Sequence, residues 1–90
     1  MDVTVKLTGT LAVRTGAHQA RLGIPEDATV ADAVEVLSRR YGPTVRTGVL
    51  DGERLRADTR VVRETARPGE ALTADSRLRA GDVVRFSLTG

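Results

Sequence analysis

The sequence predicts an α+β fold, in which one main helix packs on one face of a mixed sheet of four to five strands. Segments that alternate apolar and polar residues lie near both ends of the chain, at residues 3–7 and 84–88, as expected for half-buried strands. One strongly amphipathic segment, residues 30–41, lies between them. Because 90 residues suffice for one core but not for two, we expect a single domain over residues 1–90.

The first third of the chain predicts a β-hairpin. Residues 3–7 alternate Val and Leu with Thr and Lys, and residues 20–24 alternate Ala, Leu and Ile with Arg and Gly. We interpret residues 9–16, which begin and end with glycine, as the turn region between two antiparallel strands. Pro25 should end the second strand, because proline cannot donate a hydrogen bond to the ladder.

Residues 30–41 predict the main helix. Thr29 is a good N-cap, and Asp32 three residues later completes a capping box that is weaker than one with Glu. Such a cap stabilises a helix by about 1 kcal/mol, whereas each buried Val or Leu should contribute about 1.5–3 kcal/mol. Gly42-Pro43 provides the stop signal. Val30, Ala33, Val34, Leu37 and Tyr41 recur at helical spacing, and burial of Val30, Val34 and Leu37 should hold this helix more than its cap does.

The second half of the chain has shorter segments. We interpret residues 44–58 as a loosely patterned region with turns, residues 60–65 as a third strand and residues 71–72 as a short strand. Leu78 should be buried under the loop that leads into the last strand. The most compact closure places the last strand beside the first and parallel to it, with the helix crossing the sheet, which is the β-grasp or ubiquitin-like architecture.

Composition excludes several kinds of catalytic site. The chain has no cysteine, so thiolate catalysis, disulfides and zinc–thiolate sites are absent. We interpret His18, the one histidine, as an exposed residue at a strand edge, because no second ligand lies at metal-binding spacing. No glycine-rich phosphate loop is present. Three acids at 51, 53 and 58 could hold a cation weakly, but a hydrated loop is the simpler interpretation. We therefore expect no enzyme and no bound metal or cofactor.

Charge and hydropathy give expectations about surroundings and partners. No segment has the pattern of a signal peptide or the length of a membrane span, so we expect a cytoplasmic protein without a membrane partner. The net charge is −2 over residues 1–38 and +4 over residues 39–90. This charge could form a basic face or an ordinary solvated surface with interleaved acids. With one Phe and one Tyr, the chain lacks platforms for base stacking, and we expect no nucleic-acid partner.

The face of the sheet away from the helix is a candidate binding surface. If residues 3, 5 and 7 face the helix, Lys6, Arg21 and Arg85 should lie on the opposite face. Arginines on such a face can anchor a protein interface, although they can also be ordinary solvated positions. For partner binding we add Phe86 and Leu88 of the last strand.

Three features resemble the MoaD/ThiS sulfur-carrier family, which includes the small subunit of molybdopterin synthase. They are the helix start at residues 29–33, the segment Leu78-Arg79-Ala80-Gly81-Asp82-Val83-Val84, and a sequence that finishes on Gly90. The resemblance implies that Gly90, with Thr89 before it, forms a tail whose terminal carboxylate becomes a thiocarboxylate. It also implies two partners: a ubiquitin-activating-like adenylyltransferase, which uses ATP and a sulfur donor, and a larger enzyme that accepts the sulfur.

The tail departs from the family pattern, because Thr89 stands where these carriers have the first of two glycines. Threonine is β-branched and stiffer than glycine. An alternative is therefore a non-catalytic ubiquitin-like protein-binding module that has lost the carrier chemistry.

Overall fold

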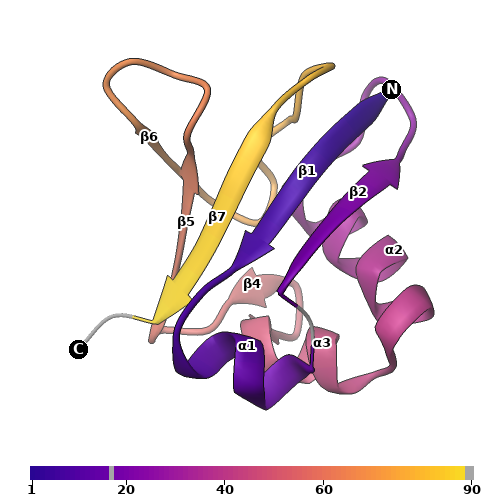
Figure 1. The fold of residues 1–90 in the computed structure, drawn as a ribbon, viewed down its shortest axis with the longest axis vertical. Coiled ribbons are helices and arrows are strands. Elements are labelled where there is room, and N and C mark those ends of the chain that lie inside the picture. Colours follow the sequence, from indigo (N-terminus) through magenta and orange to yellow (C-terminus); the bar gives the residue numbers. More distant parts are fainter. Residues whose placement is uncertain (17, 89–90) are drawn as a thin grey trace.

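The computed structural model describes residues 1–16 and 18–88, and this part of the chain contains three helices, a five-stranded sheet and a small hairpin. The helices are α1 (Thr10–Thr15), α2 (Val30–Tyr41) and α3 (Thr44–Val49). The strands are β1 (Asp2–Leu7), β2 (Gln19–Gly23), β3 (Leu50–Asp51), β4 (Arg54–Leu55), β5 (Thr59–Arg63), β6 (Glu70–Leu72) and β7 (Val83–Leu88). Figure 1 shows β7 in the middle of the main sheet, between β1 and β5.

The strand order of the main sheet is β2-β1-β7-β5-β6. β1 pairs antiparallel with β2, as the hairpin pattern predicts, and parallel with β7, as the predicted closure requires. β5 pairs antiparallel with β7 on one side and with β6 on the other. The predicted β-grasp arrangement, with one main helix against a mixed sheet, is confirmed.

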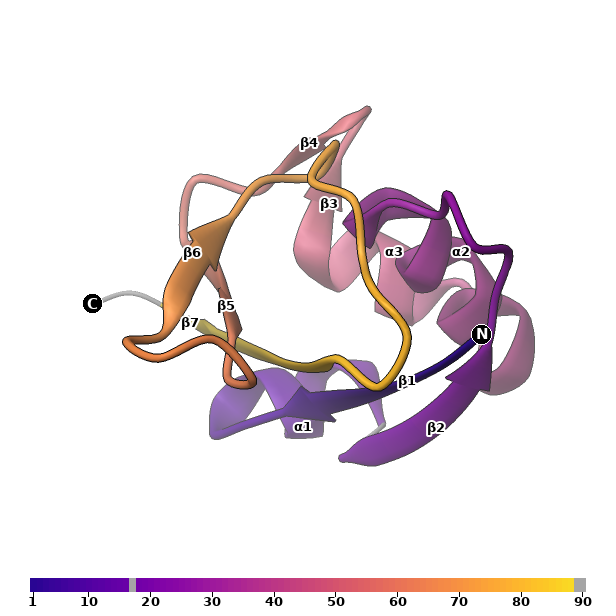
Figure 2. The same cartoon turned by 90° about the horizontal axis from the view of Figure 1, so that it is seen from above.

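The main helix begins and ends where its sequence signals place it. Thr29 accepts a hydrogen bond from the Asp32 amide at 3.2 Å, and the Asp32 carboxylate accepts one from the Thr29 amide at 2.9 Å. Gly42 ends the helix. Figure 2 shows α2 and α3 on the same side of the sheet, where α2 presents its buried residues Val30, Ala33, Val34 and Leu37.

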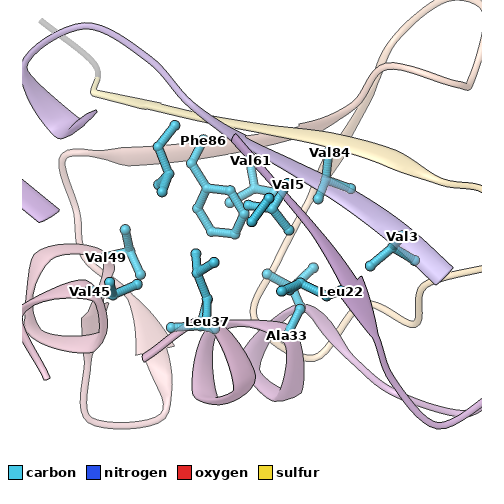
Figure 3. Close-up of a cluster of buried hydrophobic side chains, with 14 of the residues drawn as sticks. Val3, Val5, Leu22, Ala33, Leu37, Val45, Val49, Val61, Val84 and Phe86 are labelled. Atoms are coloured by element: carbon cyan, nitrogen blue, oxygen red, sulfur yellow. The ribbon is translucent and has the colours of Figure 1, made fainter. Parts of the chain in front are cut away.

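The core between sheet and helices is almost wholly aliphatic. Phe86 is its one buried aromatic residue in the described part of the chain, and its ring lies between the sheet and the α2 and α3 side chains (Figure 3). It is surrounded by residues that include Val5, Val61, Leu37, Val45 and Val49. Aliphatic packing therefore supplies most of the burial, as the composition predicts.

Two regions differ from the sequence interpretation. Residues 9–16 are not a simple turn: they contain α1, whose C-terminus is closed by Gly16 in the left-handed conformation. Residues 44–58 are more ordered than expected, since they contain α3 and the β3–β4 hairpin. Both short helices bury apolar side chains, so burial rather than intrinsic propensity explains their formation.

The loop before β7 is closed by a buried ion pair. The side chains of Arg63 and Asp82 are only 5% and 7% exposed, and the Arg63 Nε atom lies 3.3 Å from the Asp82 carboxylate. Asp82 also accepts hydrogen bonds from the Thr65 hydroxyl and from the Arg79 amide, both at 2.9 Å. Leu78 is buried beneath this loop, as predicted. The Gly-Asp motif is therefore a structural device that starts β7.

Candidate functional site

The outward face of the sheet brings two of the predicted cations together. Lys6 of β1 and Arg85 of β7 are directly opposite one another in the parallel register. Glu64, just after β5, lies between them: its carboxylate is 3.2 Å from the Lys6 ammonium and 3.4 Å from the Arg85 guanidinium. The three side chains are between 29% and 46% exposed. Sequence reasoning missed Glu64, which partly neutralises the two cations.

Arg21 lies on the same sheet but apart from this pair. It is exposed on the edge strand β2 and is opposite Thr4 rather than Lys6. Its backbone carbonyl accepts a hydrogen bond at 3.0 Å from Arg40 of α2. The guanidinium of Arg40 thus covers one of the acceptor groups on the free edge of the sheet.

The two apolar candidates for partner binding, Phe86 and Leu88, differ in burial. Phe86 is 1% exposed and belongs to the core, so its side chain does not contribute to the surface. Leu88 is partly buried and packs against the same core. Phe86 nevertheless helps to join β7 to the end of β1, since its carbonyl accepts hydrogen bonds from the Thr8 amide at 3.1 Å and the Thr8 hydroxyl at 3.0 Å.

The predicted sulfur-carrying positions, Thr89 and Gly90, lie outside the described residues. Leu88, the last described residue, is opposite Thr59 at the end of the β5–β7 ladder. Strand β7 is hydrogen-bonded on both sides, to β1 and to β5. β7 is therefore a central strand of the main sheet.

A groove of about 820 Å³ lies beside the first half of α2. It is lined by Leu50 and Leu55 of the β3–β4 hairpin, and by Glu35 and Arg46, which form an ion pair. Asp75 also lines it, and the Thr73 hydroxyl, 2.6 Å away, lowers the pKa of this carboxyl together with its own backbone amide. Of the described residues predicted to bind a partner, none lines this groove, although Glu53, one of the three acids considered for a cation, does.

A second, smaller cavity of about 220 Å³ lies between α1, α3 and the turn after β4. Arg14 and Arg56 line it together with Thr44, Thr47 and Gly48. Sequence reasoning missed this site, because Arg14 was assigned to a turn and Arg56 to a loosely patterned region. Arg14 and Arg56 are more than forty positions apart, and no local pattern in the sequence indicates that the fold brings them together.

The described residues show neither a metal site nor a membrane span. In residues 1–16 and 18–88, no group of three or more His, Cys, Asp or Glu side chains could hold a metal ion. His18 is exposed next to β2, as interpreted from the sequence. The helices of the same part of the chain are all too short or too polar to cross a membrane.

No protein-family model matches the sequence, and the search of curated proteins also found no match. Solved structures do match, over nearly the full length of both chains. The crystal structure of SAMP1 from Haloferax volcanii superimposes with a TM-score of 0.80 at 25% identity, and covers 100% of this chain and 97% of that one.

Two further solved structures match at lower identity. One is named molybdopterin converting factor, subunit 1, from Pyrococcus furiosus, with a TM-score of 0.71, 24% identity, and coverage of 100% of this chain and 99% of that one. The other is the BexX/CysO complex of Amycolatopsis orientalis, with a TM-score of 0.73, 17% identity, and coverage of 98% and 96%. The chain therefore has the ubiquitin-like β-grasp fold, and its predicted resemblance to the MoaD/ThiS sulfur-carrier family is confirmed at the level of the whole fold.

Proposed function

We propose that this chain is a sulfur-carrier-like protein rather than an enzyme, and that a partner converts its C-terminal glycine, Gly90, to a thiocarboxylate for cofactor or metabolite biosynthesis. The observation that carries the proposal is the full-length match to SAMP1 and to the two other ubiquitin-like structures. Strand β7 supports it, because the strand is held on both sides and Gly90 follows its last residue by two positions.

The chemistry requires no catalytic side chain from this protein. A partner adenylyltransferase of the ubiquitin-activating type would join the Gly90 carboxylate to the α-phosphate of ATP, releasing pyrophosphate. Sulfide from a donor would then attack the carbonyl carbon, the carbon–oxygen bond to AMP would break, and AMP would leave. One oxygen of the carboxylate is thereby replaced by sulfur. Because the partner binds ATP and receives the sulfur from the donor, we assign no bound cofactor to this chain. We place the reaction in the cytoplasm.

The outward sheet face is the proposed docking surface for the two partners, the adenylyltransferase and the larger sulfur-accepting enzyme. Lys6 and Arg85 lie side by side there, and Arg21 extends the basic surface toward the β2 edge. Charges at the rim of an interface mainly change the rate of association and its dependence on salt. Glu64 should make this surface selective, because an acidic partner must displace it from Lys6 and Arg85.

Intact-mass spectrometry tests the proposal directly. The protein is incubated with a cognate adenylyltransferase, ATP and a sulfide source, and we expect the mass increase of one oxygen replaced by sulfur. A variant that lacks Gly90 should show no increase while keeping the circular dichroism spectrum of the folded protein, because terminal residues make few buried contacts. A sulfur-loaded protein in which the label maps to any position other than Gly90 would overturn the assignment.

The alternative function, a ubiquitin-like protein-binding module, is favoured by one specific observation. Three cationic side chains, of which Arg21 and Arg85 are exposed and Lys6 is partly exposed, lie on a sheet face that consists of residues other than Thr89 and Gly90. If deleting Gly90 left partner binding and cellular activity unchanged while Arg85→Glu abolished both, this alternative would replace the carrier function.

A further inference from the structure

We propose that the cavity lined by Arg14 and Arg56 binds a phosphate group, at the end of the molecule where β7 finishes. The site is separate from the Gly90 chemistry, and its residues belong to α1, to α3 and to the turn between β4 and β5. None of these residues lies on the outward sheet face. The inference therefore stands or falls independently of the proposed carrier function.

The charge of the cavity is the first argument. Arg14 and Arg56 approach the same carboxylate, that of Asp58, at 3.7 Å and 3.6 Å. Two positive charges thus share one negative charge, and both distances exceed those of a good charge-assisted hydrogen bond. Each of the three side chains remains 42% to 44% exposed. Both guanidinium groups therefore keep donors that an incoming anion can use.

The size and remaining lining of the cavity are the second argument. A volume of about 220 Å³ corresponds to roughly seven water molecules at about 30 Å³ each, which is below the usual range for drug-sized ligands. Thr44 and Thr47 line the same cavity, and the Thr47 hydroxyl already donates to the Pro43 carbonyl at 3.3 Å and to the Thr44 carbonyl at 3.4 Å. Arginine forks match the geometry of phosphate oxygens, so Arg14 and Arg56 are the donors that would recognise the anion.

The fold holds the two arginines in place from opposite sides. Arg56 donates a hydrogen bond from Nη1 to the Thr47 carbonyl at 3.4 Å, which ties the turn to α3. On the other side, α1 packs closely on α3 at Gly48, where an added Cβ atom would lie 3.0 Å from Thr15 and 3.4 Å from Arg14. Gly48 therefore permits the close helix approach that brings Arg14 to the cavity.

The cavity lies at the end of the molecule where β7 finishes. Asp58 immediately precedes Thr59, which is opposite Leu88 at the end of β7. Figure 1 shows α1 and α3 at this same end of the molecule, near the end of the β7 arrow. A phosphate bound there would lie on the side of the protein from which the last strand points outward.

Titration by two-dimensional NMR tests the site. Inorganic phosphate and AMP are each added to ¹⁵N-labelled protein, and the amides of Thr47 and Gly48 and the Arg14 and Arg56 Nε signals are followed. We expect saturable shifts at these positions, weakened by about tenfold or more in Arg14→Gln and Arg56→Gln, because each removes a charge-assisted donor. Arg67→Gln is the matched control, since Arg67 is an exposed arginine in the loop after β5, at the opposite end of that strand.

Asp58→Asn provides a second test, because its expected result is tighter phosphate binding, which damage to the fold would not produce. Removing the competing carboxylate should tighten phosphate binding by about two- to fivefold, the range of one exposed ion pair. Tighter binding of AMP than of phosphate would identify a nucleotide as the source of the group, and equal binding would identify free phosphate. The proposal is overturned if neither phosphate nor AMP causes saturable shifts, or if adenosine, added as a control without phosphate, causes the same shifts. It is also overturned if Arg67→Gln weakens phosphate binding as much as Arg14→Gln does, or if Asp58→Asn fails to tighten phosphate binding. Deleting Gly90 should leave the titration unchanged.

Discussion

Two clusters of arginine and aspartate lie at opposite ends of β7, and they differ in burial. At its start, Arg63 and Asp82 are 5% and 7% exposed, and Asp82 is held by further hydrogen bonds from Thr65 and Arg79. At its end, Arg14, Arg56 and Asp58 are more than 40% exposed, with looser contacts. The same residue types thus form a structural clasp in one place and an accessible charged surface in the other.

Burial explains the difference in their roles. A buried charge that loses its partner keeps its desolvation penalty, whereas an exposed charge is simply hydrated. The clasp at Asp82 fixes the loop that starts β7, and so sets the register of the strand that precedes the tail. The exposed cluster contributes little to stability and is therefore free to exchange Asp58 for another anion.

The largest expected effect is at the clasp. Arg63→Ala leaves the Asp82 carboxylate buried without its cation, and leaves the Arg77 carbonyl without the donor that now lies 2.7 Å from it. We expect a loss of about 3–5 kcal/mol in the free energy of unfolding, measured by urea denaturation. Arg60→Ala is the control, because Arg60 is an exposed residue of the same strand; equal losses in both variants would contradict a special role for Arg63.

A single hydrogen bond to the clasp should have an intermediate effect. Thr65→Val removes the hydroxyl that donates to Asp82 at 2.9 Å. We expect a loss of about 1 kcal/mol in the free energy of unfolding, since the hydrogen bond is only partly buried. Thr73→Val is the matched variant, because Thr73 donates to an aspartate that is fully exposed, and it should change stability less. A larger loss of stability in Thr73→Val than in Thr65→Val would contradict this comparison.

The exposed cluster should respond weakly to the same kind of change. Arg14→Gln removes one ion pair and Asp58→Asn removes two, all between side chains that are over 40% exposed, and we expect less than about 1 kcal/mol of destabilisation from either change. Thermal unfolding at low and high salt measures this directly, because the small contribution should vanish as salt screens it. A loss as large as that of Arg63→Ala would show that the cluster is structural and would remove the contrast.

The sequence predicted the main elements where one local pattern determined them. The capping box at Thr29 and Asp32 marked the start of α2, and Gly42 marked its end. Alternation predicted β1 and β7. Their parallel pairing was inferred from the most compact closure of the sheet and not from a local signal. These are cases in which local preference and tertiary packing agree.

The missed elements are those in which tertiary contacts overrule a weak local signal. Helix α1 has no side-chain cap and no acid in its first turn, so residues 9–16 carry no capping signal that would predict a helix. Gly48 suggested a turn, yet it lies inside α3, at a close contact with α1 where an added Cβ atom would be 3.0 Å from Thr15. Arg63 was assigned to an ordinary strand because its partner Asp82 lies nineteen positions later.

The smallest expected effect on stability concerns Asp75. Because this carboxylate is exposed, a change in its pKa should alter the free energy of unfolding very little. The Thr73 hydroxyl, together with the backbone amide of Asp75, holds the pKa of this carboxyl below its ordinary value. Because the folded-state pKa is lowered, its small contribution to stability is present above the ordinary pKa and is lost as the pH falls through the lowered one. We expect Thr73→Val to raise the pKa in a ¹³C-carboxyl NMR titration, whereas Thr73→Ser, which keeps the hydroxyl, should leave it lowered. An unchanged pKa in Thr73→Val would show that the backbone amide alone lowers it, and that even close contacts to exposed carboxylates have little local effect in this fold.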